Sequence, residues 1–170
     1  MTDAEIVTLE DSRRVTVRPL STGDATALGD FYESIPAADE RFYRPHPLTR
    51  EEASRVAADA DNGTFVCLVA ERPDGAIAGY AWLRWKEGAD RSGFGICIST
   101  GYKGVGLGRA LTSRIAEVAC TVGPPVIGLT VQKANLAAFD LYRSMGFEVV
   151  REQLRRGDGE PEYYMERRVR

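Results

Sequence analysis

The fold of this 170-residue chain is decided by the segment Lys103-Gly104-Val105-Gly106-Leu107-Gly108-Arg109-Ala110. A short apolar run, Ile96-Cys97-Ile98, precedes it, and apolar residues at helical spacing follow it. Strand, glycine-rich turn and helix in this order place unobstructed backbone N–H groups at a helix N-terminus, which suits a phosphate or pyrophosphate. Glycine is needed there because a Cβ would block close approach of the phosphate oxygens. The segment therefore predicts a phosphorylated cofactor.

The glycine spacing argues against two common nucleotide loops. A P-loop needs Gly-x-x-x-x-Gly-Lys-Ser/Thr, which residues 101–109 do not supply. A dinucleotide fingerprint needs Gly-x-Gly-x-x-Gly and usually follows the first strand of its fold. Here Gly104, Gly106 and Gly108 alternate with other residues, well past the midpoint of the chain. A nucleotide-binding α/β protein stays open as an alternative.

The loop resembles the acyl-CoA loop of the GCN5-related N-acetyltransferases, the GNAT superfamily, which reads Arg/Gln-x-x-Gly-x-Gly/Ala. Lys103 stands in the Arg/Gln place, with Gly106 and Gly108 as the paired small residues. Lysine keeps the cation but loses the planar fork of arginine. Downstream, Asn135–Phe147 is similar to the family's Asn-x-x-Ala-x-x-x-Tyr-x-x-x-Gly-Phe segment. The resemblance is sharp over 92–147 and architectural elsewhere.

Composition predicts one globular domain, because 170 residues with 44% hydrophobic and 28% charged residues suffice for a core. The net charge of -3 argues against a nucleic-acid partner. No apolar run approaches the roughly 20 residues of a membrane span, and no secretory signal is visible, so we expect a cytoplasmic protein without a membrane partner. Cys67, Cys97 and Cys120 form no Cys-x-x-Cys pair, and His46 is the one histidine. We therefore expect buried reduced thiols and no metal site.

Apolar patterns and turn signals predict an α/β fold with a mixed, mostly antiparallel central sheet flanked by helices. This single domain is expected over 12–170, after a loose segment over 1–11. Strands are expected over 15–20, 65–70, 77–85, 92–98, 126–131, 148–155 and 162–168, and helices over 25–32, 50–60, 107–120 and 135–146. Residues 35–47 hold three prolines and are expected to be irregular. This order of elements is the one that the GNAT fold has.

The resemblance implies acetyl transfer from acetyl-CoA to an amine. Backbone N–H groups from Val105 to Ala110 would take the pyrophosphate, with Lys103 and Arg109 adding charge. The strand at 96–98 is implied to splay from the next strand, to pair with the pantetheine arm, and to offer an N–H near Ile98 or Cys97 to the acetyl oxygen. The implied cofactor-binding residues are Ile96, Cys97, Ile98, Lys103, Gly104, Val105, Gly106, Leu107, Gly108, Arg109, Ala110, Asn135 and Tyr142.

Tyr142 matches the family's general-acid tyrosine, which gives a proton to the leaving thiolate. A phenol with a pKa near 10 can protonate a thiolate whose conjugate acid has a pKa near 8.5. Asn135 is first a helix N-cap and, two turns from Tyr142, lies on the same side of the helix. The alternative is that Tyr142 only packs in the core, because Ala138 and Met145 share its stripe.

The sequence does not indicate the general base. Many family members place a glutamate on the strand before the loop, whereas residues 92–98 hold no carboxylate. Surface carboxylates near the expected site are alternatives, as are a water chain and an amine that arrives neutral. These carboxylates are Glu33, Asp39, Glu40, Glu87 and Asp90.

In the family, the first two helices and their connection form one wall of the acceptor pocket. Residues 40–47 interleave aromatics with arginines, which suits an acceptor that bears a carboxylate or phosphate, although an ordered loop is the plainer interpretation. Trp82 and Trp85 differ by an odd step and are expected on opposite faces of their strand. The candidate acceptor-binding residues are Tyr32, Phe42, Tyr43, Arg44, His46 and Trp82.

We therefore expect an N-acetyltransferase that moves acetyl from acetyl-CoA to a primary amine by direct attack, with a small-molecule acceptor. Protein or peptide acetylation is an alternative within the class. A non-catalytic acyl-CoA-binding sensor is another, because the strand carboxylate is missing. A homodimer through the C-terminal hairpin is compatible with the sequence. The acceptor, the acyl chain length and the pathway are not encoded in any pattern that we recognise.

Overall fold

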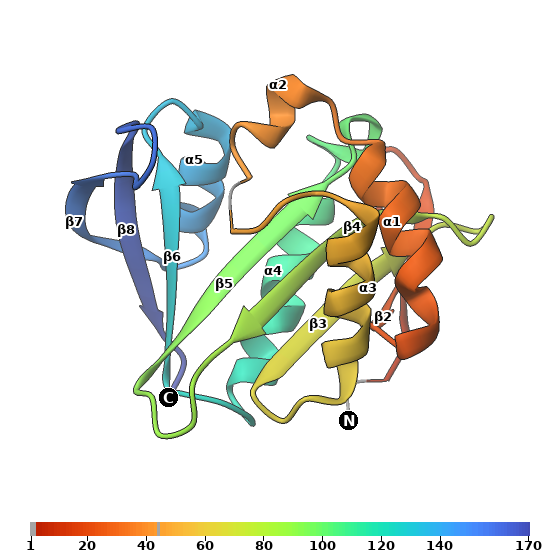
Figure 1. Ribbon diagram of the computed structural model, residues 1–170, viewed down its shortest axis with the longest axis horizontal. Coiled ribbons are helices and arrows are strands. Elements are labelled where there is room, and N and C mark those ends of the chain that lie inside the picture. Colours follow the sequence, from red (N-terminus) through yellow and green to blue (C-terminus); the bar gives the residue numbers. More distant parts are fainter. Residues whose placement is uncertain (1–2, 44) are drawn as a thin grey trace.

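The computed structural model describes residues 3–43 and 45–170. Within these residues the chain forms an eight-stranded sheet in the order β1-β2-β3-β4-β5-β6-β8-β7 (Figure 1). Neighbouring strands are antiparallel except for β5 and β6, which are parallel. The strands are β1 (Glu5–Thr8), β2 (Arg14–Pro19), β3 (Phe65–Glu71), β4 (Ile77–Arg84), β5 (Arg91–Ile98), β6 (Val126–Gln132), β7 (Glu148–Leu154) and β8 (Pro161–Arg168). The expectation of a mixed, mostly antiparallel sheet flanked by helices is confirmed.

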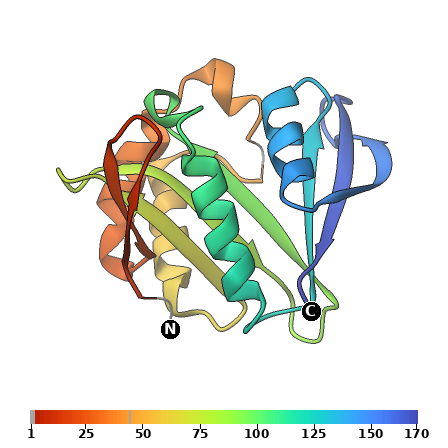
Figure 2. The same ribbon diagram turned by 180° about the vertical axis from the view of Figure 1, so that it is seen from behind.

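Helices cover both faces of the sheet. α1 and α3 lie on the face seen in Figure 1, and α4 and α5 lie on the opposite face, seen in Figure 2. The α-helices are α1 (Ala25–Glu33), α2 (Ala37–Glu40), α3 (Arg50–Ala58), α4 (Leu107–Ala119) and α5 (Leu136–Ser144), with 3-10 turns at Thr22–Asp24, Asp59–Asp61 and Thr100–Tyr102.

Side-chain caps fix the start of two helices. The Thr49 hydroxyl accepts a hydrogen bond from the Glu52 N–H at 3.2 Å and begins α3. The Asn135 side chain accepts from the Ala138 N–H at 3.3 Å and begins α5, as expected for an N-cap. Both residues are short and polar, so they satisfy N–H groups that have no partner inside the helix.

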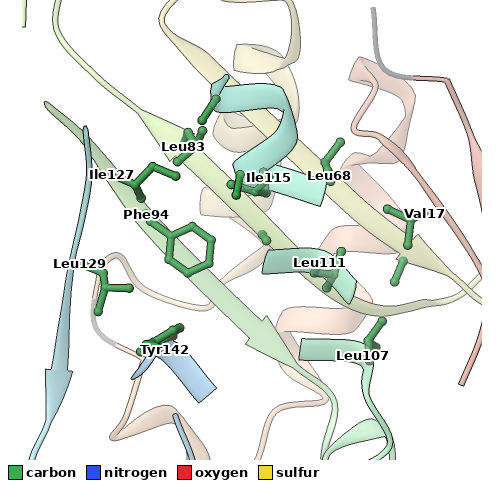
Figure 3. Close-up of a cluster of buried hydrophobic side chains, with 14 of the residues drawn as sticks. Val17, Leu68, Leu83, Phe94, Leu107, Leu111, Ile115, Ile127, Leu129 and Tyr142 are labelled. Atoms are coloured by element: carbon green, nitrogen blue, oxygen red, sulfur yellow. The ribbon is translucent and has the colours of Figure 1, made fainter. Parts of the chain in front are cut away.

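Two hydrophobic clusters sandwich the sheet. One lies between the sheet and helices α4 and α5, and its labelled members in Figure 3 include Leu83, Leu111 and Ile127. The other lies under α1 and α3. Successive strand residues supply opposite clusters. Trp82 packs against the α1/α3 cluster and Trp85 against the α4/α5 cluster, so the expectation of opposite faces is confirmed.

Three local expectations differ from the structure. Within the segment expected to be loose, Glu5–Thr8 form β1 on β2, because Val7 and the buried Leu9 pack on the α4/α5 cluster. Within the proline-rich segment, the single turn α2 follows Pro36, whose fixed φ suits a helix start. Cys67 and Cys97 are buried free thiols as expected, whereas Cys120 lies at the exposed end of α4.

No helix in the described part of the chain is both long enough and apolar enough to cross a membrane.

Candidate active site

The two parallel strands β5 and β6 separate partway along their length. They pair only where Arg91, Ser92 and Gly93 meet Val126, Ile127 and Gly128. Beyond these pairs, β5 continues to Ile98 and β6 to Gln132 without further pairing between them. Side chains of the α4/α5 cluster border the widening space. Figure 3 shows Phe94 of β5, Leu129 of β6 and Tyr142 of α5 converging there.

This separation leaves backbone groups of β5 without a strand partner. The Ser99 N–H donates to the Ala78 carbonyl at 2.9 Å, and hydrogen-bonded pairs alternate along an antiparallel ladder. The N–H and C=O of Cys97 therefore face Tyr80 in β4, whereas those of Ile96 and Ile98 face the opening. Of the two expected oxyanion donors, Ile98 has its N–H on the open side.

A cavity of about 650 Å³ lies at the separation. Its wall comes from β4, β5, β6, α5, the β7–β8 hairpin and the segment that follows α2. The lining residues are Phe42, Tyr43, Pro45, Trp82, Gly93, Phe94, Gly95, Ile96, Gly128, Leu129, Thr130, Gln132, Tyr142, Gln153, Leu154, Arg155, Arg156, Glu162 and Tyr164. A volume of this size suits a small organic ligand.

Two glycines let aromatic side chains lie directly on the strands. A Cβ on Gly95 would stand 2.4 Å from the Trp82 indole, and a Cβ on Gly128 would stand 2.5 Å from the Tyr164 hydroxyl. Both distances are shorter than any real van der Waals contact, so a side chain at either position would require the aromatic ring to shift. The cavity wall therefore depends on glycines outside the loop segment.

The glycine loop has the backbone conformation that its sequence requires. Gly104 and Gly106 have φ of +71° and +88°, and α4 begins directly after Gly106. The first N–H groups of α4 have no intrahelical acceptor and carry the positive end of the helix dipole. The loop is braced from the β1–β2 turn, where the Glu10 N–H donates to the Val105 carbonyl at 3.0 Å and Arg13 donates to the Gly101 carbonyl at 2.7 Å.

The two cations expected at the loop have protein partners. Lys103 forms an ion pair with Asp39 of α2 at 2.8 Å, and the hydrogen bond from Lys103 holds the pKa of Asp39 below its usual value. Arg109 donates to the Ser144 hydroxyl at 2.9 Å and so links α4 to α5. The Glu10 carboxylate also lies near the loop, 3.1 Å from where a Cβ of Gly106 would stand. Sequence reasoning did not indicate this acidic neighbour.

Tyr142 belongs both to the core and to the cavity wall. Its ring packs edge-on against Phe94 at 6.0 Å and against Phe147 at 5.7 Å between centroids, and the residue is 7% exposed. Burial raises the pKa of Tyr142. Among the described residues, none forms a hydrogen bond with its hydroxyl. The phenol is therefore held in its protonated form at the edge of the cavity.

Three of the expected acceptor-binding residues, Phe42, Tyr43 and Trp82, line the cavity. Two others lie elsewhere. His46 lines a second cavity of about 410 Å³, which Trp82 also lines. Tyr32 is 1% exposed and packs in the α1/α3 cluster with its ring 5.5 Å from that of His46, so it does not line the first cavity, and its contact with the acceptor stays a prediction. The remaining residue, Arg44, lies outside the described residues.

A hydrogen-bonded aromatic group stands behind this wall. The Trp82 indole donates to the Tyr43 hydroxyl at 2.9 Å, and His46 Nε2 lies 3.0 Å from the hydroxyl of Tyr43 and 2.9 Å from that of Tyr80. Tyr43 and Tyr80 also share a hydrogen bond. Burial raises the pKa of both tyrosines and lowers that of His46, so the group is neutral at neutral pH. The sequence did not indicate a place for Tyr80 in this group, because a tyrosine within an apolar strand is expected to pack in the core.

None of the carboxylates suggested as a base from sequence lines the cavity. Glu33 pairs with Arg50, Asp39 with Lys103, and Asp90 with Arg91. Glu40 and Glu87 are also absent from the wall. The carboxylate that does line it is Glu162 of β8, which is 6% exposed. Its position in the C-terminal hairpin gave no indication from sequence that this side chain would be buried.

Comparisons with known proteins agree with this geometry. A model of the acetyltransferase (GNAT) domain matches residues 14–148. Streptothricin acetyltransferase of Streptomyces lavendulae is 36% identical over 127 residues, which cover 74% of this chain and 65% of that protein. Mycothiol acetyltransferase of Beutenbergia cavernae is 33% identical over 119 residues, which cover 67% of this chain and 40% of that protein. The GNAT domain of S. lividans PAT has the same fold, with a TM-score of 0.81 at 22% identity over 97% of this chain and 96% of that one.

The chain belongs to the GNAT acetyltransferase family. It spans less than two thirds of the length of the two curated relatives named above.

Proposed function

We propose that this protein is an acetyl-CoA-dependent N-acetyltransferase that moves an acetyl group to a primary amine of a small molecule by direct attack. The observation that carries the proposal is the separation of β5 from β6 after three residue pairs. It combines an unpaired strand edge, a cavity of about 650 Å³ and a buried tyrosine at one place.

The residues present fit acetyl-CoA. The N–H groups at the start of α4 suit the pyrophosphate, and the unpaired backbone of Ile96 and Ile98 suits an amide-bearing arm that adds as an extra strand. Lys103 and Arg109 contribute positive charge near the loop. Acetyl-CoA supplies the activated acyl group. The Ile98 N–H is suited to donate to the acetyl oxygen, where negative charge develops as the amine attacks.

Tyr142 is proposed as the proton donor to the leaving sulfur. The amine nitrogen bonds to the acetyl carbon, the carbon–sulfur bond breaks, and the phenol proton passes to the sulfur. Burial keeps Tyr142 protonated across the ordinary pH range. Ionisation of Tyr142 should therefore add no step to the dependence of the rate on pH in that range. The amine loses one proton to water in the same reaction, and a proton from water restores the phenol of Tyr142.

The cavity supports a small acceptor over a protein side chain. Phe42 and Tyr43 bound it on one side, and residues 153–156 of the β7–β8 hairpin bound it on another. The names of the two relatives above refer to streptothricin and mycothiol, which are small molecules. We propose that the acceptor of this chain is likewise a small molecule.

The test measures CoA release from acetyl-CoA with a panel of primary amines, for the wild type and for Tyr142→Phe. We expect Tyr142→Phe to lower kcat about 10²-fold or more, because general acid catalysis contributes roughly 10²–10⁴-fold. Acetyl-CoA affinity should change little. Tyr163→Phe is the matched control, because Tyr163 packs on Phe139 outside the cavity wall.

Three results would contradict the proposal. Equal kcat for Tyr142→Phe and the wild type would remove Tyr142 from catalysis. Tight binding of acetyl-CoA without turnover of any amine or peptide would instead favour the sensor, and turnover of peptides alone would favour protein acetylation.

A further inference from the structure

Two buried polar side chains in the cavity wall are not used by the mechanism above. Gln132 ends β6, Glu162 lies near the start of β8, and the two residues are partners in the antiparallel register. Each is 6% exposed and each lines the cavity. Register partners on adjacent strands lie on the same face of a sheet, so the two side chains face one region of the cavity.

Gln132 presents a hydrogen-bond acceptor that has no partner. Its Nε2 donates to the Arg41 carbonyl at 3.1 Å, and a carbonyl can only accept, so this contact fixes the orientation of the amide. Its Oε1 is then buried, and no group among the described residues donates to it. A buried acceptor without a donor is costly, which suggests that a ligand supplies one.

Glu162 presents a carboxylate that forms no direct ion pair among the described residues, although the charge of Arg155 interacts with it electrostatically. Its Oε1 accepts from Gln153 Nε2 at 2.6 Å, and among the described residues no lysine or arginine forms an ion pair with it. Arg155 of the same wall is engaged by Asp158 and by the Arg41 carbonyl. Buried glutamates are rarely left without a positive partner, because the desolvated charge is costly.

We propose that Glu162 and Gln132 form a subsite that binds an ammonium group of the acceptor. This inference rests on the proposed function in one respect, that the acceptor occupies this cavity. An ammonium group has three donors and no acceptor, so it complements a carboxylate oxygen and an amide oxygen together. Aromatic rings of Trp82 and Tyr164 in the same wall suit a cation further. The substrate class is therefore an amine that carries a positive charge and can pack against aromatic rings.

The test is a calorimetric titration of the whole protein without acetyl-CoA, so it does not depend on turnover. The probes are phenethylamine and its neutral isostere, phenethyl alcohol. We expect the wild type to bind the amine at least about tenfold more tightly than the alcohol, as for charge-assisted hydrogen bonds. Glu162→Gln should lose at least about tenfold of the amine affinity and none of the alcohol affinity.

Controls separate the subsite from general electrostatics and from misfolding. Glu160→Gln removes the same charge two residues away at an exposed position outside the wall, and should bind like the wild type. Gln132→Met should weaken amine binding while keeping the side-chain length. A thermal melt verifies that each variant folds. If Glu162→Gln does not fold, the ratio of amine affinity to alcohol affinity in the wild type tests the subsite.

Any of three binding results would overturn the subsite: no binding of the amine, equal binding of amine and alcohol by the wild type, or an equal loss in Glu162→Gln and Glu160→Gln. Turnover of amines that is indifferent to Glu162→Gln would overturn it while leaving the acetyltransferase proposal intact. Amine binding that depends on Glu162, without acetyl transfer, would support the subsite and count against the proposed function.

Discussion

At the scale of single residues, glycines outside the loop segment determine the shape of the acceptor side. The Trp82 indole lies on Gly95 so closely that a Cβ there would be 2.4 Å from the ring. The same indole donates to the Tyr43 hydroxyl and so ties β4 to the segment after α2. A side chain at position 95 would therefore displace two lining residues at once.

Gly95→Ala is expected to lower the free energy of unfolding by about 1–3 kcal/mol, as overpacking does, and to raise KM for the amine. The affinity for acetyl-CoA should change less, because Gly95 directs its N–H and C=O toward β4. Urea unfolding and steady-state kinetics measure both effects. Gly93→Ala is the matched control, since its Cβ would meet only ordinary contacts of 3.7 Å and 4.0 Å. Equal behaviour of the two variants would contradict this account.

At the scale of elements, the turn that enters α4 is proposed to couple backbone conformation to cofactor binding. Gly106 has φ of +88° and is the N-cap residue of α4. An L-residue in this region costs about 1–2 kcal/mol. A Cβ at this position would also approach the Glu10 carboxylate at 3.1 Å.

Gly106→Ala should lower the free energy of unfolding by about 1–2 kcal/mol and weaken acetyl-CoA binding, because both need the same turn. Gly101→Ala is the control, because that position has open space and no positive φ, and should behave as the wild type. Chemical unfolding and a direct binding titration measure the two quantities. Unchanged acetyl-CoA affinity in a folded Gly106→Ala protein would remove the loop from the binding site.

The start of α1 is joined to the sheet by a partly buried ion pair. Arg18 of β2 donates to both oxygens of Asp24 at 2.8 Å, and the Ser21 N–H donates to Asp24 Oδ2 at 2.7 Å. Burial by itself raises the pKa of Asp24, but the hydrogen bonds from Arg18 and Ser21 outweigh it, so the pKa lies below its usual value. The ionised form is thus stabilised by folding.

The stability from Asp24 is expected in full above its unfolded pKa of about 3.9, and to be lost as pH falls through the lower folded value. Asp24→Asn should therefore destabilise the protein by about 1–3 kcal/mol at pH 7 and by less near pH 3. Urea unfolding at both pH values measures the difference. Asp61→Asn, at an exposed position, should show neither effect. A constant destabilisation across pH would contradict the assignment.

At the scale of the whole molecule, ligand binding is expected to raise thermal stability. Acetyl-CoA contacts α4, β5 and α5 in the proposed complex and has no counterpart site in the unfolded chain. Acetyl-CoA at about 100 times its Kd should add about 2.7 kcal/mol, which for a domain of this size raises Tm by roughly 5–11 °C. A thermal melt with ATP and NAD as controls measures this. A rise with ATP or NAD but none with acetyl-CoA would contradict the assignment of the loop.

The homodimer through the C-terminal hairpin stays a prediction, which light scattering would test.

The sequence by itself determined the glycine loop, the α5 segment with Tyr142, and the order of elements, because each is encoded in neighbouring residues. Turn chemistry and helical spacing act over a few positions, so they can be read locally. β1 escaped detection because its four residues are stabilised by pairing with β2 and not by a local pattern.

Only the tertiary structure decided which side chains meet across the sheet. Glu162 and Gln132 lie thirty residues apart and become neighbours through the β6–β8 register. Tyr80 joins Tyr43 and His46 through the packing of β4 against the segment after α2. The five suggested carboxylates look equivalent to Glu162 in sequence, yet long-range pairing alone buries Glu162 in the cavity wall. Burial and pairing are sums over distant contacts, so no local pattern specifies them.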